Sequence, residues 1–336
     1  MSWRKKADPD KPYVKKNFAN WLAQVAMLLL PKFFYVIAGR GSGKTTDLQA
    51  ERLIEMVYDM PGAPVVWVSD TYTNLYKNVL PTLLEALEKK GFIEGIHYEI
   101  GKAPKEYTEA QKANLDPKIR KYFWKPFNKL ASYKNTLIFF TGLNVRFGSL
   151  DKPASLAGSS YVHVFGDEVK YFKEAKIANL LKAVRGYRDT YGHSVFYRGH
   201  TFTTDMPNTA NIGEYDWILK QGSRMRKIGL MLILKAAFIM NEIMGELLAA
   251  KDAKNTEEVI KKKRSYERWA ERWTQARLSE DGSTFFYIAS SYVNVDVLSP
   301  EWFDDAIATD LGDLNTAVLS MRAGLESGDR FYSNLA

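Results

Sequence analysis

The stretch from Ala38 to Thr45 (AGRGSGKT) limits most strongly what this chain can fold into. An apolar run, Phe33 to Ala38 (FFYVIA), leads into it, and a helical pattern from Lys44 to Met60 follows. Aromatic and β-branched residues favour a strand, and glycines allow turns that other residues resist. The sequence therefore predicts a strand, a glycine loop and a helix, which is the context of a phosphate-binding Walker A motif.

This loop has the residue types that phosphate binding requires, apart from Ala38 where the first glycine usually stands. Its glycines let successive N–H groups face a β-phosphate at the positive end of the helix. Lys44 is expected to reach the β- and γ-phosphates, and the Thr45 hydroxyl to ligate Mg²⁺, with Thr46 as the alternative. A glycine turn that merely begins a helix would not explain Gly-Lys-Thr at this place. We expect ATP and Mg²⁺ as cofactors, with nucleotide bound by Ala38, Gly39, Arg40, Gly41, Ser42, Gly43, Lys44, Thr45 and Thr46.

An acidic pair ends a second apolar stretch, Val162 to Glu168 (VHVFGDE), as in a Walker B motif. Asp167 at the strand end is predicted to hold Mg²⁺, and Glu168 to activate the attacking water as a general base. A solvated strand end is the plain alternative, but the phosphate loop upstream favours the catalytic interpretation. A second carboxylate directly after the metal ligand indicates hydrolysis and not a kinase reaction.

The rest of the chain alternates between strand and helix patterns. Strands are expected at Ala63–Val68, Thr136–Phe140, Asn144–Phe147, Tyr161–Phe165 and Ser194–Thr203, and helices at Asn17–Leu30 and at Asn74–Lys90, with a kink or break at Pro81. Lys102–Ser132 is interpreted as an insertion or loop, and the chain beyond Tyr215 as mostly helical, with an amphipathic stretch from Glu242 to Leu278. This alternation predicts an α/β fold with a mostly parallel central sheet flanked by helices.

Composition narrows the possible partners. The chain has 47 Lys and Arg against 39 Asp and Glu, a formal charge of +8, which favours nucleic acid, although many proteins carry such a charge without binding it. It has no Cys and 4 His, which excludes disulfides and makes a zinc site improbable. The most apolar run, Ile228–Met240, is interrupted by Lys235 and is predicted to be buried core, with no membrane association. Met1–Lys16 lacks the apolar stretch of a secretory signal, so we expect a cytoplasmic protein.

Several segments together resemble the large terminase subunits of tailed double-stranded DNA viruses. The segments, in chain order, are the Walker A loop with a basic residue early in it, Phe147–Glu168 (FGSLDKPASLAGSSYVHVFGDE), Val184–Arg188 (VRGYR), Thr201–Pro207 (TFTTDMP) and Ile288–Trp302 (IASSYVNVDVLSPEW). The resemblance runs from about Phe33 almost to the C-terminus. One departure is Asp205-Met206-Pro207, where Asn-Pro is usual in the family.

The resemblance implies a P-loop NTPase of the ASCE type, the additional-strand, catalytic-glutamate class, acting as a DNA-packaging motor. Arg40 would sense or stabilise the γ-phosphate in cis. Arg185 or Arg188, on the family's Arg-x-x-Arg helix, would be an arginine finger for a neighbouring subunit, unless both are solvated surface charges. Thr203 and Thr204 would couple loss of the γ-phosphate to DNA movement, unless they only cap the strand end.

The resemblance also implies partners: double-stranded DNA, a portal protein ring, a small terminase subunit and further copies of the chain in a ring, a pentamer by analogy. The protein would reside in the host cell cytoplasm and dock transiently on the viral procapsid. Thr71–Lys77 and the basic Lys261–Arg264 are candidate DNA contacts, the latter with an ordinary solvated helix face as the alternative. For adenine, the aromatic side chains of Phe18, Trp21 and Phe33 are available, with core packing as the default.

The predicted domains are residues 1–32, an N-terminal tail and helix; 33–220, the ATPase core; and 221–336, a mostly helical lid or linker. The family's nuclease domain is expected to be absent, and the cluster Asp304, Asp305, Asp310 and Asp313 is interpreted as a polar helical face. Two alternative functions stay open: a helicase-like or remodelling ATPase, and a scaffold that binds nucleotide without hydrolysing it. Glu168 discriminates the scaffold, because only an enzyme needs a general base.

Overall fold

One mixed sheet organises the molecule. The computed structural model describes residues 19–152, 156, 158–308 and 314–322 of the 336-residue chain. The strands are β1 Phe33–Ala38, β2 Pro64–Ser69, β3 Tyr98–Ile100, β4 Thr136–Phe139, β5 Asn144–Ser149, β6 His163–Gly166, β7 Gly199–Thr204 and β8 Thr284–Ala289, in the order β3-β4-β5-β2-β6-β7-β1-β8. From β5 to β8 all neighbours are parallel, and only β4 is antiparallel to its neighbours. The predicted fold class is confirmed.

The sheet order has one feature that decides the chemistry. β7 lies between the strand that leads into the phosphate loop, β1, and the strand that carries the acidic pair, β6. The three strands are parallel, so their carboxyl ends meet at one edge of the sheet. An additional strand at this position is what the ASCE class predicts, and it places Thr203 and Thr204 between the loop and the acidic pair.

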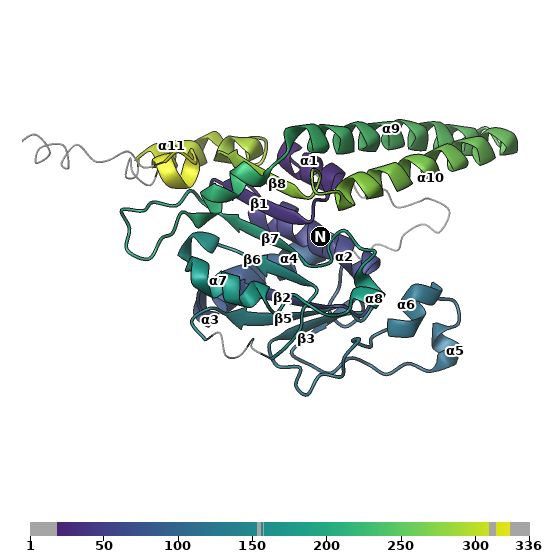
Figure 1. Ribbon diagram of the computed structural model, residues 1–336, viewed down its shortest axis with the longest axis horizontal. Helices are drawn as coiled ribbons and strands as arrows, with labels where there is room; N and C mark the ends of the chain where they lie inside the picture. Colours follow the sequence, from purple (N-terminus) through teal and green to yellow (C-terminus); the bar gives the residue numbers. More distant parts are fainter. Residues whose placement is uncertain (1–18, 153–155, 157, 309–313, 323–336) are drawn as a thin grey trace, which may run out of the picture.

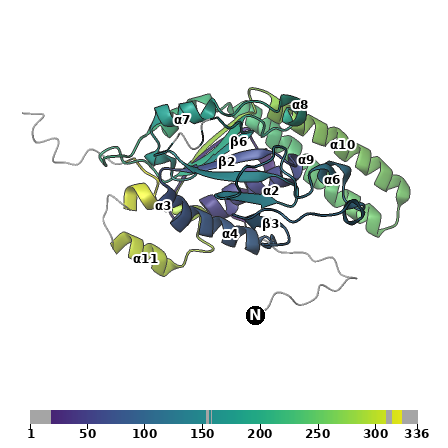
Figure 2. The same ribbon diagram turned by 90° about the horizontal axis from the view of Figure 1, so that it is seen from below.

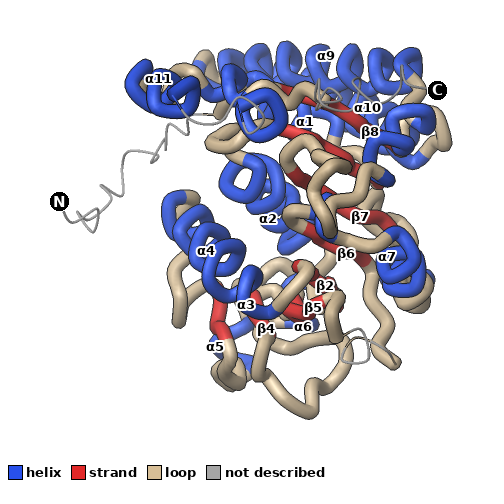
Figure 3. The backbone as a smooth tube through the Cα atoms, turned by 90° about the vertical axis from the view of Figure 1, so that its left-hand side faces the viewer, coloured by secondary structure: helices blue, strands red, loops and turns tan. Residues whose placement is uncertain are grey.

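Helices cover both faces of the sheet, as Figures 1 and 3 show. The helices are α1 Trp21–Leu29, α2 Ala50–Asp59, α3 Tyr72–Asn74, α4 Leu80–Lys89, α5 Glu109–Lys112, α6 Pro117–Tyr122, α7 Glu174–Leu181, α8 Arg188–Tyr191, α9 Lys227–Asp252, α10 Thr256–Leu278 and α11 Pro300–Ala308. In the view from below, α4 and α7 lie on opposite sides of the strands (Figure 2). Three apolar clusters result in the described part of the chain, one under α2 and α4, one under α7, and one where α1 and α9 pack on β1 and β8. Because both faces are covered, β1 and β2 are almost entirely apolar, whereas β7 between β1 and β6 carries buried His and Thr side chains.

The predicted helix over Asn74–Lys90 exists but is not uniform. It consists of α3, a π-helical turn Leu75–Val79 and α4, and Pro81 stands in the first turn of α4. Proline has no N–H to donate and disfavours the helix interior. The chain therefore widens into a π turn directly before it, which is the break that the sequence predicted.

One predicted strand was too long. Ser194–Thr203 reads as a continuous run, but only Gly199–Thr204 pairs in the sheet. Ser194 instead donates a hydrogen bond of 2.5 Å from its hydroxyl to Asp59, and Arg198 has a positive φ of 56°. The apolar side chains before Gly199 are buried from a loop, so their hydropathy imitates a strand without forming one.

The predicted domain boundary at residue 220 was also wrong. β8 pairs in parallel with β1 over its whole length, from Phe33 with Thr284 to Ala38 with Ala289. A strand from the part expected to be a helical lid therefore belongs to the central sheet. Short segments after it, Ser291–Asn294 and Leu314–Val318, lie against the phosphate loop. The core built around the sheet thus includes residues on both sides of the α9–α10 hairpin.

The apolar run Ile228–Met240 is only partly buried core, because one face of it packs in the interior and the other is exposed. It belongs to α9, which pairs with α10 in a long helical hairpin, and the turn between them also splits the single amphipathic stretch predicted for Glu242–Leu278 (Figure 1). Ile233 is fully buried, but Met231 and Leu232 are 68% and 59% exposed. α9 has 26 residues, with a mean hydropathy of 1.7 in its most apolar window and 33% of that window buried. By length and composition alone it could cross a membrane, a test that core helices also pass.

Candidate nucleotide-binding site

The phosphate loop has the backbone conformation that the glycines predict. Gly41 and Gly43 have positive φ angles of 72° and 81°, which other residues adopt only with strain. A side chain on Gly39 would lie 2.4 Å from the Ser291 hydroxyl and equally close to the Val318 carbonyl. A helical turn starts at Lys44, so the first N–H groups of that turn have no carbonyl behind them to bond. The loop therefore presents N–H groups at a helix start, as phosphate binding requires.

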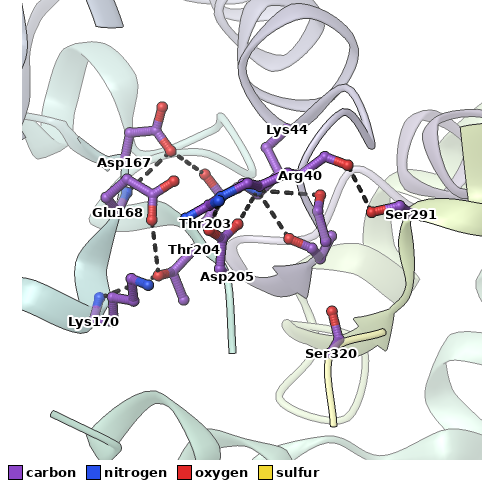
Figure 4. A network of polar contacts seen from close by, with 12 residues as sticks. Arg40, Lys44, Asp167, Glu168, Lys170, Thr203, Thr204, Asp205, Ser291 and Ser320 are labelled. Carbon is purple, nitrogen blue, oxygen red and sulfur yellow. Dashed lines mark hydrogen bonds and ion pairs between the residues drawn. The ribbon is translucent and has the colours of Figure 1, made fainter. Parts of the chain in front are cut away.

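A chain of hydrogen bonds joins the loop to the two neighbouring strands (Figure 4). The Thr45 hydroxyl donates to Asp167 Oδ2 at 2.8 Å, and the Thr203 hydroxyl donates to Asp167 Oδ1 at 2.9 Å. Gln49 Nε2 donates to the Thr203 hydroxyl at 2.8 Å. The two groups predicted to hold Mg²⁺, Thr45 and Asp167, are thus in contact, and Thr203 fixes the carboxylate from the other side.

Glu168 stands at the same edge with an unusual backbone. Its φ and ψ of 52° and 46° are left-handed, a conformation that costs a non-glycine residue energy and that clusters at functional sites. Its Oε2 accepts a hydrogen bond from the Thr204 hydroxyl at 3.3 Å. Burial, followed by repulsion from Asp205, raises the pKa of Glu168 to about 7, against the attraction of Lys44. A carboxylate with such a pKa is suited to accept a proton near neutral pH.

Lys44 is held inside its own loop. Its Nζ donates to Asp205 Oδ1 at 2.5 Å, to the Ala38 carbonyl at 2.8 Å and to the Gly39 carbonyl at 3.3 Å. Burial lowers the pKa of Lys44, but Asp205 and the acidic pair more than offset this and raise it. Arg40 points to the same place, with Nε 3.7 Å from Asp205 Oδ2 (Figure 4). Both cations predicted to contact phosphates therefore face one carboxylate.

Sequence reasoning missed several members of this site. Gln49 is fully buried on a helix face where apolar residues are expected, so the pattern could have marked it. The backbone N–H of Lys170 donates to the Thr204 hydroxyl, and the Lys170 ammonium pairs with Glu214 at 3.5 Å. Asn294 donates to the Gly41 carbonyl at 2.7 Å from about 250 residues away in sequence. The family resemblance covered the segment of Asn294, Ile288–Trp302, but did not indicate its contact with the loop.

The residues present fit ATP and Mg²⁺. Hydroxyl and carboxylate oxygens, here Thr45 and Asp167, are the ligands that Mg²⁺ prefers. Gly39 has no room for a side chain, which indicates a loop shaped by its backbone. Bound there, Mg²⁺ would supply positive charge beside the phosphates. Thr46, the alternative ligand, donates to Asp47 at 3.2 Å, so the structure favours Thr45 for the metal.

Arg185 and Arg188 lie away from this site in the same chain. The Ala183 carbonyl accepts from the N–H of Tyr161, which precedes β6, so this segment lies at the amino edge of the sheet. α8 begins only at Arg188, and Gly186 and Tyr187 have positive φ angles, so no single helix carries both arginines. The expected Arg-x-x-Arg helix was wrong. A finger role toward a neighbouring subunit stays a prediction.

The aromatic residues considered for adenine binding differ in their distance from the loop. Phe33 begins β1 and packs on His200, at the opposite end of the strand from the loop, so it cannot reach adenine. Trp21 is 47% exposed, and its neighbour Asn20 donates from Nδ2 to the Ser42 carbonyl of the loop at 3.1 Å. Trp21 therefore stays a candidate for contact with adenine. Phe18, Asp310 and Asp313 lie outside the described residues.

The two candidate DNA surfaces differ in charge balance. Lys262 in the basic Lys261–Arg264 stretch pairs with Glu246 at 2.6 Å and with Glu258 at 3.6 Å. Thr71–Lys77 follows β2 at the carboxyl edge and has an exposed Lys77. The solvated-face interpretation is therefore favoured for Lys261–Arg264.

The structure of this chain is similar to several solved structures whose sequences are only distantly similar to it. No protein-family model matches the sequence, and no curated protein matches it. The large terminase of a thermophilic bacteriophage, in complex with ADP, aligns with a TM-score of 0.47 and 11% identity, over 89% of this chain and 52% of that protein. The Thermus phage P74-26 large terminase ATPase domain gives a TM-score of 0.32, 14% identity and coverage of 59% and 66%.

The Phi-28 gp11 DNA packaging motor gives a TM-score of 0.34 and 16% identity over 60% of this chain and 56% of that one. This chain spans about half the length of the ADP-bound large terminase. At these identities and TM-scores, the function has to be argued from the site itself.

Proposed function

We propose that this protein hydrolyses ATP with Mg²⁺ and uses the energy to move double-stranded DNA into a viral procapsid. The observation that carries the ATPase part is the hydrogen-bonded chain from Thr45 through Asp167 to Thr203, with Glu168 beside it. A phosphate loop, a metal carboxylate, a base and a sensing strand are the parts that ATP hydrolysis needs.

Each residue has a task in this proposal. The loop and Lys44 bind the phosphates, Thr45 and Asp167 hold the metal, and Glu168 accepts a proton from the attacking water. The raised pKa of Glu168 and its left-handed backbone conformation support its role as the base. A scaffold that only binds nucleotide would have no need for either feature.

The DNA-packaging part rests on the order of the sequence motifs and on the net positive charge of +8. In this proposal the protein works in the host cell cytoplasm, in a ring with further copies of itself. It docks there on a portal ring together with a small subunit. Arg40 acts on its own γ-phosphate, and Arg185 or Arg188 acts on the neighbour's.

The test is ATP hydrolysis with and without blunt-ended duplex DNA. We expect the duplex to stimulate the wild type, and Glu168→Gln to lose about 10²–10⁴-fold in rate while still binding ATP. Glu174→Gln, an exposed glutamate on α7, is the matched control and should behave as wild type. Wild-type rates in Glu168→Gln would refute the catalytic assignment. Strand separation of the duplex would favour the helicase alternative, and ATP binding without turnover would favour the scaffold.

A further inference from the structure

The three N–H donors of the Lys44 ammonium are all engaged within the protein. An ammonium has three donors, and Lys44 directs them to Asp205 and to the Ala38 and Gly39 carbonyls. The Lys44 side chain is 10% exposed and that of Asp205 5%. A phosphate oxygen can therefore bind Lys44 only if one of these bonds is given up.

We infer that Asp205 is an internal anion that pairs with the phosphate-binding cations and must release Lys44 when nucleotide binds. This inference rests on the proposed nucleotide site. The carboxylate oxygens of Asp205 face the two cations assigned to the phosphates, at 2.5 Å from Lys44 Nζ and 3.7 Å from Arg40 Nε. A carboxylate and a phosphate satisfy the same donors, so they compete for them.

The bonds to carbonyls are less suited to this exchange than the bond to Asp205. The Ala38 and Gly39 carbonyls belong to the loop backbone, which also bonds to Ala289 and Ala317. The Asp205 carboxylate instead sits on a side chain at the end of β7, where rotation can withdraw it. Of the three bonds, the one to Asp205 is thus the one that can be exchanged while the loop keeps its shape.

The position of Asp205 gives the exchange a consequence. It directly follows Thr203 and Thr204, whose hydroxyls bond the Asp167 and Glu168 carboxylates. A change at Asp205 is therefore transmitted to the strand end that orients both catalytic carboxylates. Asp205 is a positioning residue that links phosphate occupancy to the acidic pair.

The same competition lowers the affinity for nucleotide. A ligand that must first displace an internal partner binds more weakly than one that enters a free site. Replacing Asp205 by Asn keeps the shape but removes the charge that holds Lys44. We expect Asp205→Asn to bind ADP at least about tenfold more tightly than the wild type does, since a charge-assisted bond no longer has to be broken.

The experiment measures ADP and AMP affinity by calorimetry in EDTA, so that no metal contributes. ADP should gain affinity in Asp205→Asn, while AMP, which has no β-phosphate to meet Lys44, should not. Asp205→Glu keeps the charge and should stay close to wild type. Asp216→Asn, an exposed aspartate downstream, is the matched control. Asp205→Ser removes the same charge with a smaller side chain and decides the matter if the Asn variant does not fold.

The outcomes are distinct. If the wild type binds ADP and neither uncharged variant binds it more tightly, the inference about Asp205 fails and the proposed nucleotide site stands. A gain for AMP equal to that for ADP would also overturn it, because a general loosening of the fold would act on both. If the wild type binds neither ATP nor ADP, the proposed function itself fails.

Discussion

The carboxyl edge of the sheet and the outward face of α9 reverse the usual distribution of residues. At the edge, polar and charged side chains such as Thr203 and Asp205 are buried, at 0% and 4% exposure. On α9, Met231 and Leu232 are apolar and mostly exposed. Buried polar groups are costly unless bonded, and Thr203 and Asp205 both bond partners from other segments. The polar site is therefore the more tightly specified of the two regions.

The contrast shows that hydropathy does not locate function in this chain. One face of the most apolar run of the sequence lies at the surface, and a polar cluster lies in the interior. Mutations should therefore be costly at the polar edge and nearly neutral on the exposed apolar face. The following predictions test that contrast, beginning with the largest expected effect.

Replacing Lys44 by Met should have the largest effect. It leaves Asp205, Asp167 and Glu168 close together without their central cation, and breaking a buried pair costs about 3–5 kcal/mol. We expect the free energy of unfolding, measured with urea at pH 7.5, to fall by that amount and nucleotide binding to be lost. Lys89→Met is the control, because Lys89 pairs with Glu85 at the surface. An unchanged stability would mean that the edge is not held by its charges.

On α9 the two faces should differ sharply. Ile233 is fully buried while its neighbour Leu232 is 59% exposed. Ile233→Ala should lower the free energy of unfolding by about 2–5 kcal/mol, and Leu232→Ala by less than about 0.5 kcal/mol. Thermal or urea unfolding of both variants measures the difference. Equal losses would show that the outward face is covered in solution.

Thr203→Val removes the hydroxyl that joins Gln49 to Asp167 at nearly constant shape. Both partners then lose a buried bond, which should cost about 1–3 kcal/mol in the free energy of unfolding. We also expect hydrolysis to require a higher Mg²⁺ concentration, because Asp167, the predicted metal ligand, is no longer fixed. Thr82→Val, whose exposed hydroxyl bonds only the Asn78 carbonyl, is the comparison. A loss of stability as large in Thr82→Val would count against the special role of Thr203.

The pH dependence should follow Glu168, whose pKa burial raises to about 7. A general base works when ionised, so single-turnover hydrolysis should fall about tenfold per pH unit below that pKa. Between the pKa of an exposed glutamate, about 4.5, and 7, the folded protein binds more protons than the unfolded one. The contribution of Glu168 to stability therefore declines as pH rises through this window. A pH slope of stability that persists in Glu168→Gln would assign it to another group.

Much of the fold could be predicted because local patterns there agree with the tertiary structure. β1 has the predicted bounds, Phe33–Ala38, since its aromatic and β-branched residues are buried on both faces. The error at Ser194–Thr203 has the opposite cause. Val195 and Phe196 are apolar because they fill the core, but they do so from a turn. Hydropathy records burial and not the backbone conformation that achieves it.

The site could be predicted only where its residues are close in sequence. Lys44 with Thr45, and Asp167 with Glu168, form short motifs whose residue types and spacing indicate phosphate and Mg²⁺ binding. Asp205 was visible only as a departure from a family pattern, and its partner Lys44 is 161 residues away. Ser291, whose hydroxyl donates to the Arg40 carbonyl at 2.6 Å, lay in the Ile288–Trp302 segment of the family resemblance, but nothing in that segment indicated a contact with the loop.

By itself, the sequence determined the loop, the acidic pair and the alternation of strands and helices, because glycine conformation, side-chain chemistry and residue spacing are local properties. Only the tertiary structure decided that β7 lies between β1 and β6, that β8 joins the sheet, and which face of the apolar α9 is exposed. Those outcomes depend on which surfaces meet when the whole chain packs. A side chain's burial and its partners are properties of that packing, and residues far apart in sequence share in setting them.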